Sequence, residues 1–165
     1  MRTVKTEPLT LETFAAFGSY ANLTQPDGPH LGAPPIEFFR DSLPLELGGK
    51  SPVFSVCRVE PRALVIDVLE YHSHTGEGIL PLDGDVLVQV APATPPGAPV
   101  PLEAVRVFRV PRGTMLSIRP GVWHHAPFAL EGAVNVLIVL PERTYANDCV
   151  AVPLEDSQHL RIELE

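Results

Sequence analysis

Short apolar runs alternate with turn-forming residues over most of the chain. From residue 51 onward these runs are rich in Val, Ile, Leu and aromatic side chains, and they are separated by segments such as Leu82-Asp83-Gly84-Asp85 and Pro120-Gly121. This pattern predicts strands. The expected strands cover residues 53–59, 63–71, 79–82, 85–91, 104–110, 115–118, 123–128 and 133–140. Short strands at such regular spacing are typical of an all-β sandwich or barrel.

The first fifty residues follow a different pattern. Residues 9–18 predict a short helix, with Thr10 at its N-cap and Gly18 at its end. Residues 20–35 are rich in Pro, Gly, Asn and Asp and predict a long irregular connection, of the kind that often shapes the mouth of a pocket. We therefore expect one domain over residues 1–165, with a helix and an irregular arm over 1–50 and a β-barrel over 51–165.

Length and composition indicate the size of the core and the expected cellular compartment. With 165 residues, 45% of them hydrophobic, the chain can fill a single core. Its longest apolar stretch, residues 133–140, is interrupted by Asn135 and is far shorter than the roughly 20 residues of a membrane-spanning helix. The N-terminus lacks the apolar core and cleavage site of a signal peptide. We expect a cytoplasmic protein in which Cys57 and Cys149 stay reduced.

The net charge of the protein limits the kinds of partner that it can bind. The formal net charge is −8, and no Lys/Arg cluster interrupts the acidic surface. Such a surface repels phosphate backbones and anionic lipid, so we expect no nucleic-acid or membrane partner. An anionic small substrate would need a locally placed arginine or a bound cation to receive it.

The most informative segment runs from Glu70 to Gly84. On a strand, His72 and His74 project from the same face, so both imidazoles can converge on one ion, and Glu77 adds an oxygen ligand after a turn. His124, in Pro120-Gly121-Val122-Trp123-His124-His125, supplies a third imidazole. These four residues predict a site for a divalent metal such as nickel, zinc, manganese or iron(II). The alternative is that the histidines are ordinary surface or core residues.

This arrangement resembles the two signature motifs of the cupin superfamily. Those motifs are H-x-H with a nearby Glu, six residues and Gly, and later P-x-G-x-x-H. Two residues separate His74 from Glu77 here instead of the usual three or four, Pro120 directly precedes Gly121, and Phe128 replaces the usual Asn. The resemblance implies a cupin-type (RmlC-like jelly-roll) β-barrel with a short N-terminal helix.

Other polar side chains are candidates for chemistry beside the metal. Glu70 shares the strand parity of His72 and His74, so it can act as a general base or support the ligands, or it can form a salt bridge at the rim. His125 alternates with His124 and is either catalytic or a hydrogen-bonded structural residue. Among five arginines, we favour Arg58 as the contact for an anionic substrate.

The whole chain also resembles the ureidoglycolate lyase family of allantoin degradation, which belongs to purine catabolism. The similarity covers Leu9-Thr10-x-Glu12-x-Phe14-Ala15-x-Phe17-Gly18, Cys57-Arg58-x-x-Pro61, Glu70-x-His72, Ile79-Leu80-Pro81-Leu82-x-Gly84, Gly121-Val122-Trp123-His124-His125 and Asn147-Asp148-Cys149. It implies a homodimeric enzyme that splits ureidoglycolate into glyoxylate and urea. Phe38 stands where many members carry an arginine.

The resemblance also implies roles for the candidate residues. His72, His74, Glu77 and His124 would hold the metal, Glu70 or His125 would move the proton, and Arg58 would steady the substrate carboxylate. Two alternatives stay open from sequence: another metal-dependent cupin enzyme, such as an isomerase or an iron dioxygenase, and a cupin that binds a small molecule without catalysis.

Overall fold

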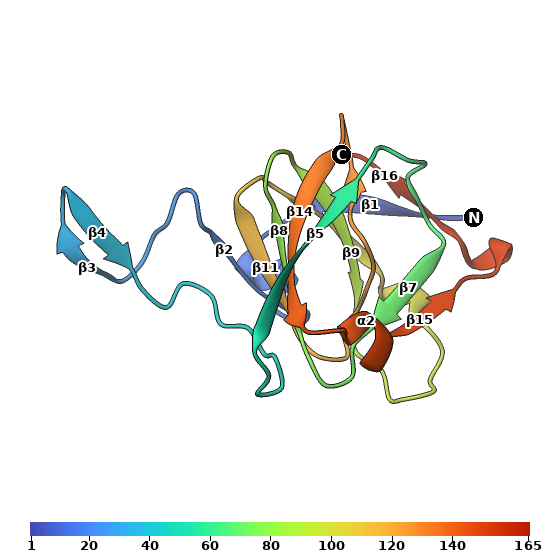
Figure 1. The fold of residues 1–165 in the computed structure, drawn as a ribbon. Coiled ribbons are helices and arrows are strands. Elements are labelled where there is room, and N and C mark those ends of the chain that lie inside the picture. The colour runs from blue at the N-terminus through green and yellow to red at the C-terminus, as the bar shows by residue number, and fades with distance from the viewer.

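Two curved β-sheets face each other and enclose one of the two apolar clusters of the protein (Figure 1). The computed structural model describes residues 1–165. The first sheet contains, in spatial order, β15 (Val150–Pro153), β7 (Val68–Tyr71), β12 (Trp123–His124), β9 (Val86–Ala91), β10 (Arg106–Val110), β1 (Arg2–Pro8), β16 (Leu160–Glu163) and β6 (Val65–Ile66), with β13 (Phe128–Ala129) paired to β9. The second contains β2 (Gly18–Asn22), β11 (Thr114–Ile118), β8 (Glu77–Pro81), β14 (Val134–Pro141) and β5 (Pro52–Val59).

Helices are few and short. They are α1 (Leu11–Phe14), α2 (Thr144–Asn147) and two 3-10 turns, η1 (Leu102–Ala104) and η2 (Asp156–Gln158). None has the length and apolar character that crossing a bilayer would take. The prediction of an all-β protein with a short N-terminal helix is therefore confirmed.

The core is divided by the first sheet. Alternate residues of β9 point to opposite faces, so Val86 and Val88 join the cluster between the two sheets, whereas Leu87 and Ala91 join a second cluster on the other face. Phe108 lies in the first cluster, where its ring meets Phe14 edge-on with centroids 5.4 Å apart. The contact holds α1 against the barrel.

The N-terminal region contributes more to the barrel than the sequence predicts. The expected helix over residues 9–18 is confined to α1, where Thr10 and Thr13 form a reciprocal capping box, and the chain enters β2 at Gly18. β1 lies between β10 and β16 and runs parallel to both. The structural boundary therefore does not fall at residue 50, because β1 and β2 belong to the two sheets.

Only the segment after β2 leaves the barrel. It carries a small hairpin of β3 (His30–Ala33) and β4 (Ile36–Phe39), which projects away from the body at the left of Figure 1. We call residues 23–48 the arm. The chain returns to the barrel where the hydroxyl of Ser117 donates to the carbonyl of Pro44 (2.7 Å) and the amide of Gly76 donates to the carbonyl of Glu46 (2.6 Å).

Candidate metal centre and active-site cavity

Two buried imidazoles and one buried carboxylate converge at the edge of the space between the sheets. Nε2 of His72 lies 3.0 Å from Oε2 of Glu77, and Nε2 of His124 lies 2.9 Å from the same oxygen. All three side chains are less than 10% exposed. His124 comes from β12 and Glu77 begins β8, so the cluster joins one strand of each sheet.

The other nitrogen of each imidazole fixes its orientation. Nδ1 of His72 lies 2.7 Å from the carbonyl of Asp148, and Nδ1 of His124 lies 2.8 Å from the carbonyl of Val122. A carbonyl oxygen only accepts, so each Nδ1 carries a hydrogen. In the neutral ring, Nε2 then carries no hydrogen, and its lone pair points at a carboxylate oxygen. Such an arrangement requires a cation between them, either a proton or a metal ion.

Electrostatics within the cluster favours the charged carboxylate. Burial alone raises the pKa of Glu77, but the charge of His124 and the hydrogen bonds from both imidazoles outweigh it and bring the pKa to about 2. Burial likewise lowers the pKa of His124, whereas the charge of Glu77 and its hydrogen bond raise it, and the net shift is upward. The carboxylate is thus an available negative ligand.

The residues present fit a divalent ion. Two ligands at right angles around an ion with bonds of about 2.1 Å lie roughly 3.0 Å apart, which is close to both nitrogen–oxygen separations in the cluster. Glu70 adds a further oxygen, since its ligand atom and those of His72 and His124 all lie within 4.8 Å of one another. Two imidazoles with one or two carboxylates suit iron, zinc, nickel or manganese.

The backbone around the histidines is fixed by two contacts. The amide of Gly121 donates to the carbonyl of His72 at 2.7 Å, which ties the turn before His124 to the loop after β7. The carboxylate of Asp148 accepts from the amides of Ser73 and His74 at 2.8 and 2.9 Å. Asp148 thus holds the His72 loop twice, with its carboxylate and with its backbone carbonyl.

A cavity of about 190 Å³ opens beside the cluster. It lies between β7, β8, β14, β5 and α2, and it is lined by Cys57, Glu70, His72, Glu77, Ala126, Pro127, Ile138, Leu140, Tyr145 and Cys149. No arginine or lysine lines it. The polar groups of the lining residues are therefore two carboxylates, one imidazole, two thiols and the hydroxyl of Tyr145, and the rest of the wall is apolar.

Glu70 reaches the cavity because β7 pairs with β12, where Glu70 stands opposite His124. The thiol of Cys149 donates to Oε2 of Glu70 at 3.4 Å. Burial and the neighbouring charge of Glu70 raise the pKa of Cys149 to about 12, so this cysteine remains a neutral thiol. Cys149 therefore serves Glu70 as a hydrogen-bond donor rather than as a nucleophile.

His74 does not reach the cluster. The expectation that it shares a face with His72 assumes a strand through both residues, but β7 ends at Tyr71 and the following residues form a loop. Asp148 holds the His74 side chain at 3.2 Å through Nδ1, and that side chain is 82% exposed. The structure therefore places three of the four predicted ligands together and leaves the fourth outside.

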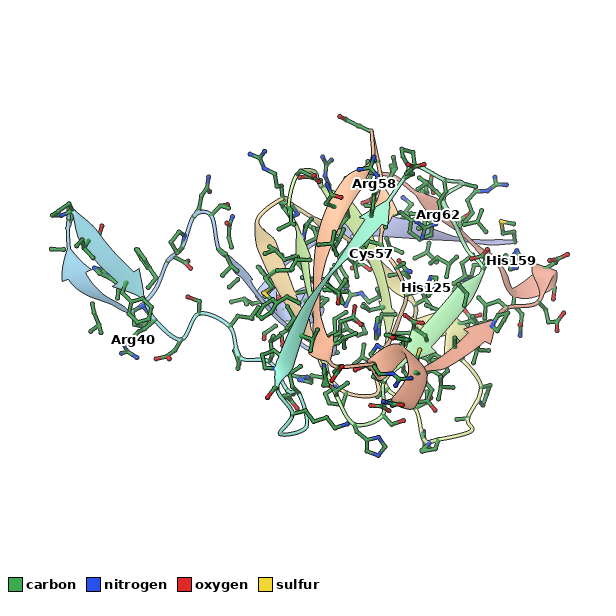
Figure 2. The ribbon with its side chains drawn as sticks, viewed as in Figure 1. Arg40, Cys57, Arg58, Arg62, His125 and His159 are labelled. Atoms are coloured by element: carbon green, nitrogen blue, oxygen red, sulfur yellow. The ribbon has the colours of Figure 1, made fainter.

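Arg58 and His125 also lie away from the cavity lining. Along β5 the side chain of Cys57 turns inward, so that of Arg58 turns outward, where it is 60% exposed and lies 3.9 Å from Glu60 (Figure 2). His125 follows β12 and is partly buried. Burial lowers its pKa, while the charge of Glu70 opposes that shift. The charge of Glu70 thus affects the pKa of His125, although His125 does not line the cavity.

Comparison with known proteins places these features in a family. The family described as ureidoglycolate lyase matches residues 1–162. The ureidoglycolate lyase of Burkholderia cepacia is 28% identical over 97% of this chain and 91% of its own length. That of Stutzerimonas stutzeri (strain A1501) is 30% identical over 99% of this chain and 96% of its own length.

A solved structure confirms the type of barrel. The crystal structure of a dTDP sugar isomerase from Desulfovibrio desulfuricans G20 matches with a TM-score of 0.51 at 17% identity and covers 86% of this chain and 87% of its own. At this identity the likeness concerns the fold alone. The predicted cupin-type barrel is thereby confirmed.

Proposed function

Because the chain belongs to the ureidoglycolate lyase family, we propose that it splits ureidoglycolate into glyoxylate and urea in the cavity beside His72, Glu77 and His124. One observation carries the proposal from family to site. The Nε2 atoms of two buried histidines meet one carboxylate oxygen, next to a cavity whose wall carries a second carboxylate, that of Glu70.

The cavity suits such a substrate in size. At about 190 Å³ it is smaller than the cavities that hold drug-sized ligands and matches a molecule of roughly ten non-hydrogen atoms. Apolar residues such as Ile138 and Leu140 form the rest of its lining. Its lining offers no arginine for the substrate carboxylate. A divalent ion held by His72, Glu77 and His124 would supply that positive charge and lower the pKa of the substrate hydroxyl.

Glu70 is the residue placed to move the proton. The reaction takes the proton from the substrate hydroxyl, converts that C–O bond to a carbonyl as the C–N bond breaks, and returns a proton to the leaving urea nitrogen. A single carboxylate can accept the first proton and deliver it to the nitrogen, so the protons balance without another group. The hydrogen bond from Cys149 orients the Glu70 carboxylate for both steps.

The test separates metal binding from proton transfer. The purified protein is analysed for bound metal and then assayed for release of both urea and glyoxylate, with and without a chelator. We expect Glu77→Gln to lose both metal and turnover. Because the Glu70 carboxylate also lies within reach of the ion, Glu70→Gln is assayed at saturating metal. Its kcat should then fall at least a hundredfold, in the range of general base catalysis. A metal-loaded wild type that releases neither product, or a Glu70→Gln variant with unchanged kcat, would refute the proposal.

A further inference from the structure

The hairpin at the end of the arm presents one face that is entirely apolar. In its register Leu31 stands opposite Phe38 and Ala33 stands opposite Ile36, and these four side chains share a face because directly paired residues project together. Leu31 is 58%, Phe38 61% and Ile36 79% exposed. The opposite face carries the ion pair of His30 and Glu37, whose nearest atoms lie 3.5 Å apart.

Nothing in the same chain covers this face. Every hydrogen bond and ion pair made by residues 27–42 stays within that segment. A single two-stranded hairpin is at best marginally stable in water. All the polar side chains of this hairpin lie on one face, together with Phe39, whose ring centroid is 5.0 Å from that of His30. A face without any polar side chain is the pattern of a strand with one buried side. The pattern therefore indicates that the apolar face of the hairpin packs against another surface.

The barrel carries a surface that matches it. β5 is the last strand of its sheet and pairs only with β14, so its outer edge is free. Phe54 is 66% and Val56 62% exposed on the outward face of that strand, the face that also carries Arg58, whereas Val53, 40% exposed, alternates with them. Beside it lies a groove of about 360 Å³ between β5, β14 and α2, lined by Val53, Val56, Ile138, Leu140 and Tyr145 among others. An apolar free edge of this kind invites a second polypeptide segment.

We propose that the hairpin of one copy packs its apolar face over β5 and the groove of a second copy, and that each copy thereby roofs the cavity of the other. The groove and the active-site cavity share Cys57, Ile138, Leu140 and Tyr145, so a segment lying in the groove forms an outer wall of the cavity. The cavity of a single chain lacks this wall.

Two features of the chain select a second copy as the occupant. The apolar face of the hairpin and the groove are both uncovered in the same molecule, so a two-fold axis satisfies both at once, in a closed and self-complementary pair. The area is also sufficient. At roughly 100 Å² for each of three large apolar side chains, counted on both surfaces and over two symmetric contacts, the pair buries on the order of 1,200 Å², the lower bound of specific interfaces.

The first experiment measures assembly of the full chain by sedimentation over a wide range of concentration. We expect a dimer, and we expect Ile36→Ser with Phe38→Ser to raise the dissociation constant at least a hundredfold. The matched control, His30→Ser with Glu37→Ser, changes the opposite face of the same hairpin and should remain dimeric. All these positions lie outside the barrel, so the thermal unfolding of the monomeric variant reports whether the fold is intact.

The second experiment locates the contact. p-Benzoylphenylalanine placed at position 38 in a mixture of ¹⁴N and ¹⁵N chains should cross-link to residues 52–59 or 138–145 of a differently labelled chain. Alkylation of Cys57 by a maleimide should be at least tenfold faster in the Ile36→Ser, Phe38→Ser variant than in its control, because the roof is removed.

Three results would overturn the inference. They are a monomeric wild type, a dimer that survives the loss of Ile36 and Phe38, and cross-links confined to chains of one label, which would place the hairpin on its own barrel. None of these measurements involves urea release. The assembly can therefore fail while the proposed reaction stands, and the reverse is equally possible.

Discussion

Asp148 offers the sharpest test of how the proposed metal centre is built. Asp148→Ala removes a carboxylate that accepts from the amides of Ser73 and His74 at 2.8 and 2.9 Å and from Nδ1 of His74 at 3.2 Å. Only 11% of that side chain is exposed, so water does not replace these contacts at no cost. The loop they hold is the one that carries His72, whose own Nδ1 donates to the carbonyl of Asp148.

The magnitude follows from these contacts. A hydrogen bond to a charged group contributes about 1.5–3 kcal/mol, and the freed amides lie near the surface where water can reach them, so we take the lower end for each of the two. Asp148→Ala should therefore lower the free energy of unfolding by about 3 kcal/mol. Loss of the partner that orients a metal ligand typically costs 10- to 100-fold in metal affinity. Asp148→Asn keeps one acceptor oxygen, so its stability and its metal affinity should lie between those of the wild type and those of Asp148→Ala.

Urea unfolding gives the stability, and titration of the metal-free protein with zinc gives the affinity. Asp83→Ala is the matched control, because Asp83 also accepts two hydrogen bonds, from the backbone and side chain of Asn135, but at the far end of β8 from Glu77. The control should bind zinc like the wild type. If Asp148→Ala binds zinc within threefold of the wild type, Asp148 does not position His72 and the reasoning fails.

Three further predictions concern the loop, the pH response and the residues outside the cavity. Gly76→Ala should destabilise the fold by about 2 kcal/mol or more and weaken metal binding, because its Cβ would overlap the carbonyl oxygen of Ile118. Gly132→Ala is the control and should do neither, since its Cβ meets nothing within 4 Å. The hydrogen bond from Arg106 holds the pKa of Glu7 below its usual range, so the stability advantage of the wild type over Arg106→Met should be complete above roughly pH 5 and shrink as the pH falls through the lowered pKa, while Glu7→Gln abolishes this pH dependence in unfolding curves. Arg58→Ala and His74→Ala should leave KM and metal content unchanged, since both side chains are more than half exposed, and a tenfold change in either quantity would restore the role that the sequence predicts for that residue.

The sequence predicts those strands that can be recognised from the apolar residues of the strand itself. Runs such as 85–91 and 133–140 consist mostly of apolar residues and are bounded by turns, and they became β9 and β14. β1 was not predicted, because Arg2–Pro8 is mostly polar and only Val4 and Thr6 are buried. Its position depends on pairing with β10 and β16, more than a hundred residues away along the chain.

The site was predictable to the extent that its residues lie on regular strands. His124 lies on β12 and Glu70 on β7, and strand parity places both correctly toward the interior. Strand parity predicts the wrong direction for the His74 side chain. The residues after Tyr71 form a loop, whose conformation is held by hydrogen bonds to Asp148. Asp148 and Cys149 were noted only within the family resemblance, since neither residue type in a C-terminal turn signals a contact 70 or more positions earlier.

The positions of the arginines bear on how this acidic protein could receive an anionic substrate. A net charge of −8 requires that an anionic substrate be met by a local positive charge. Arg58 points outward, and Arg62 is occupied by the carbonyls of Ala126 and Pro127 and stacks 3.8 Å over the ring of Phe128. The cavity lining itself contains two carboxylates and no permanent cation. If the proposed reaction takes place in this cavity, the positive charge that receives the substrate would come from an ion held by His72, Glu77 and His124. Substrate binding would then depend on metal binding, and metal-free protein should not bind ureidoglycolate.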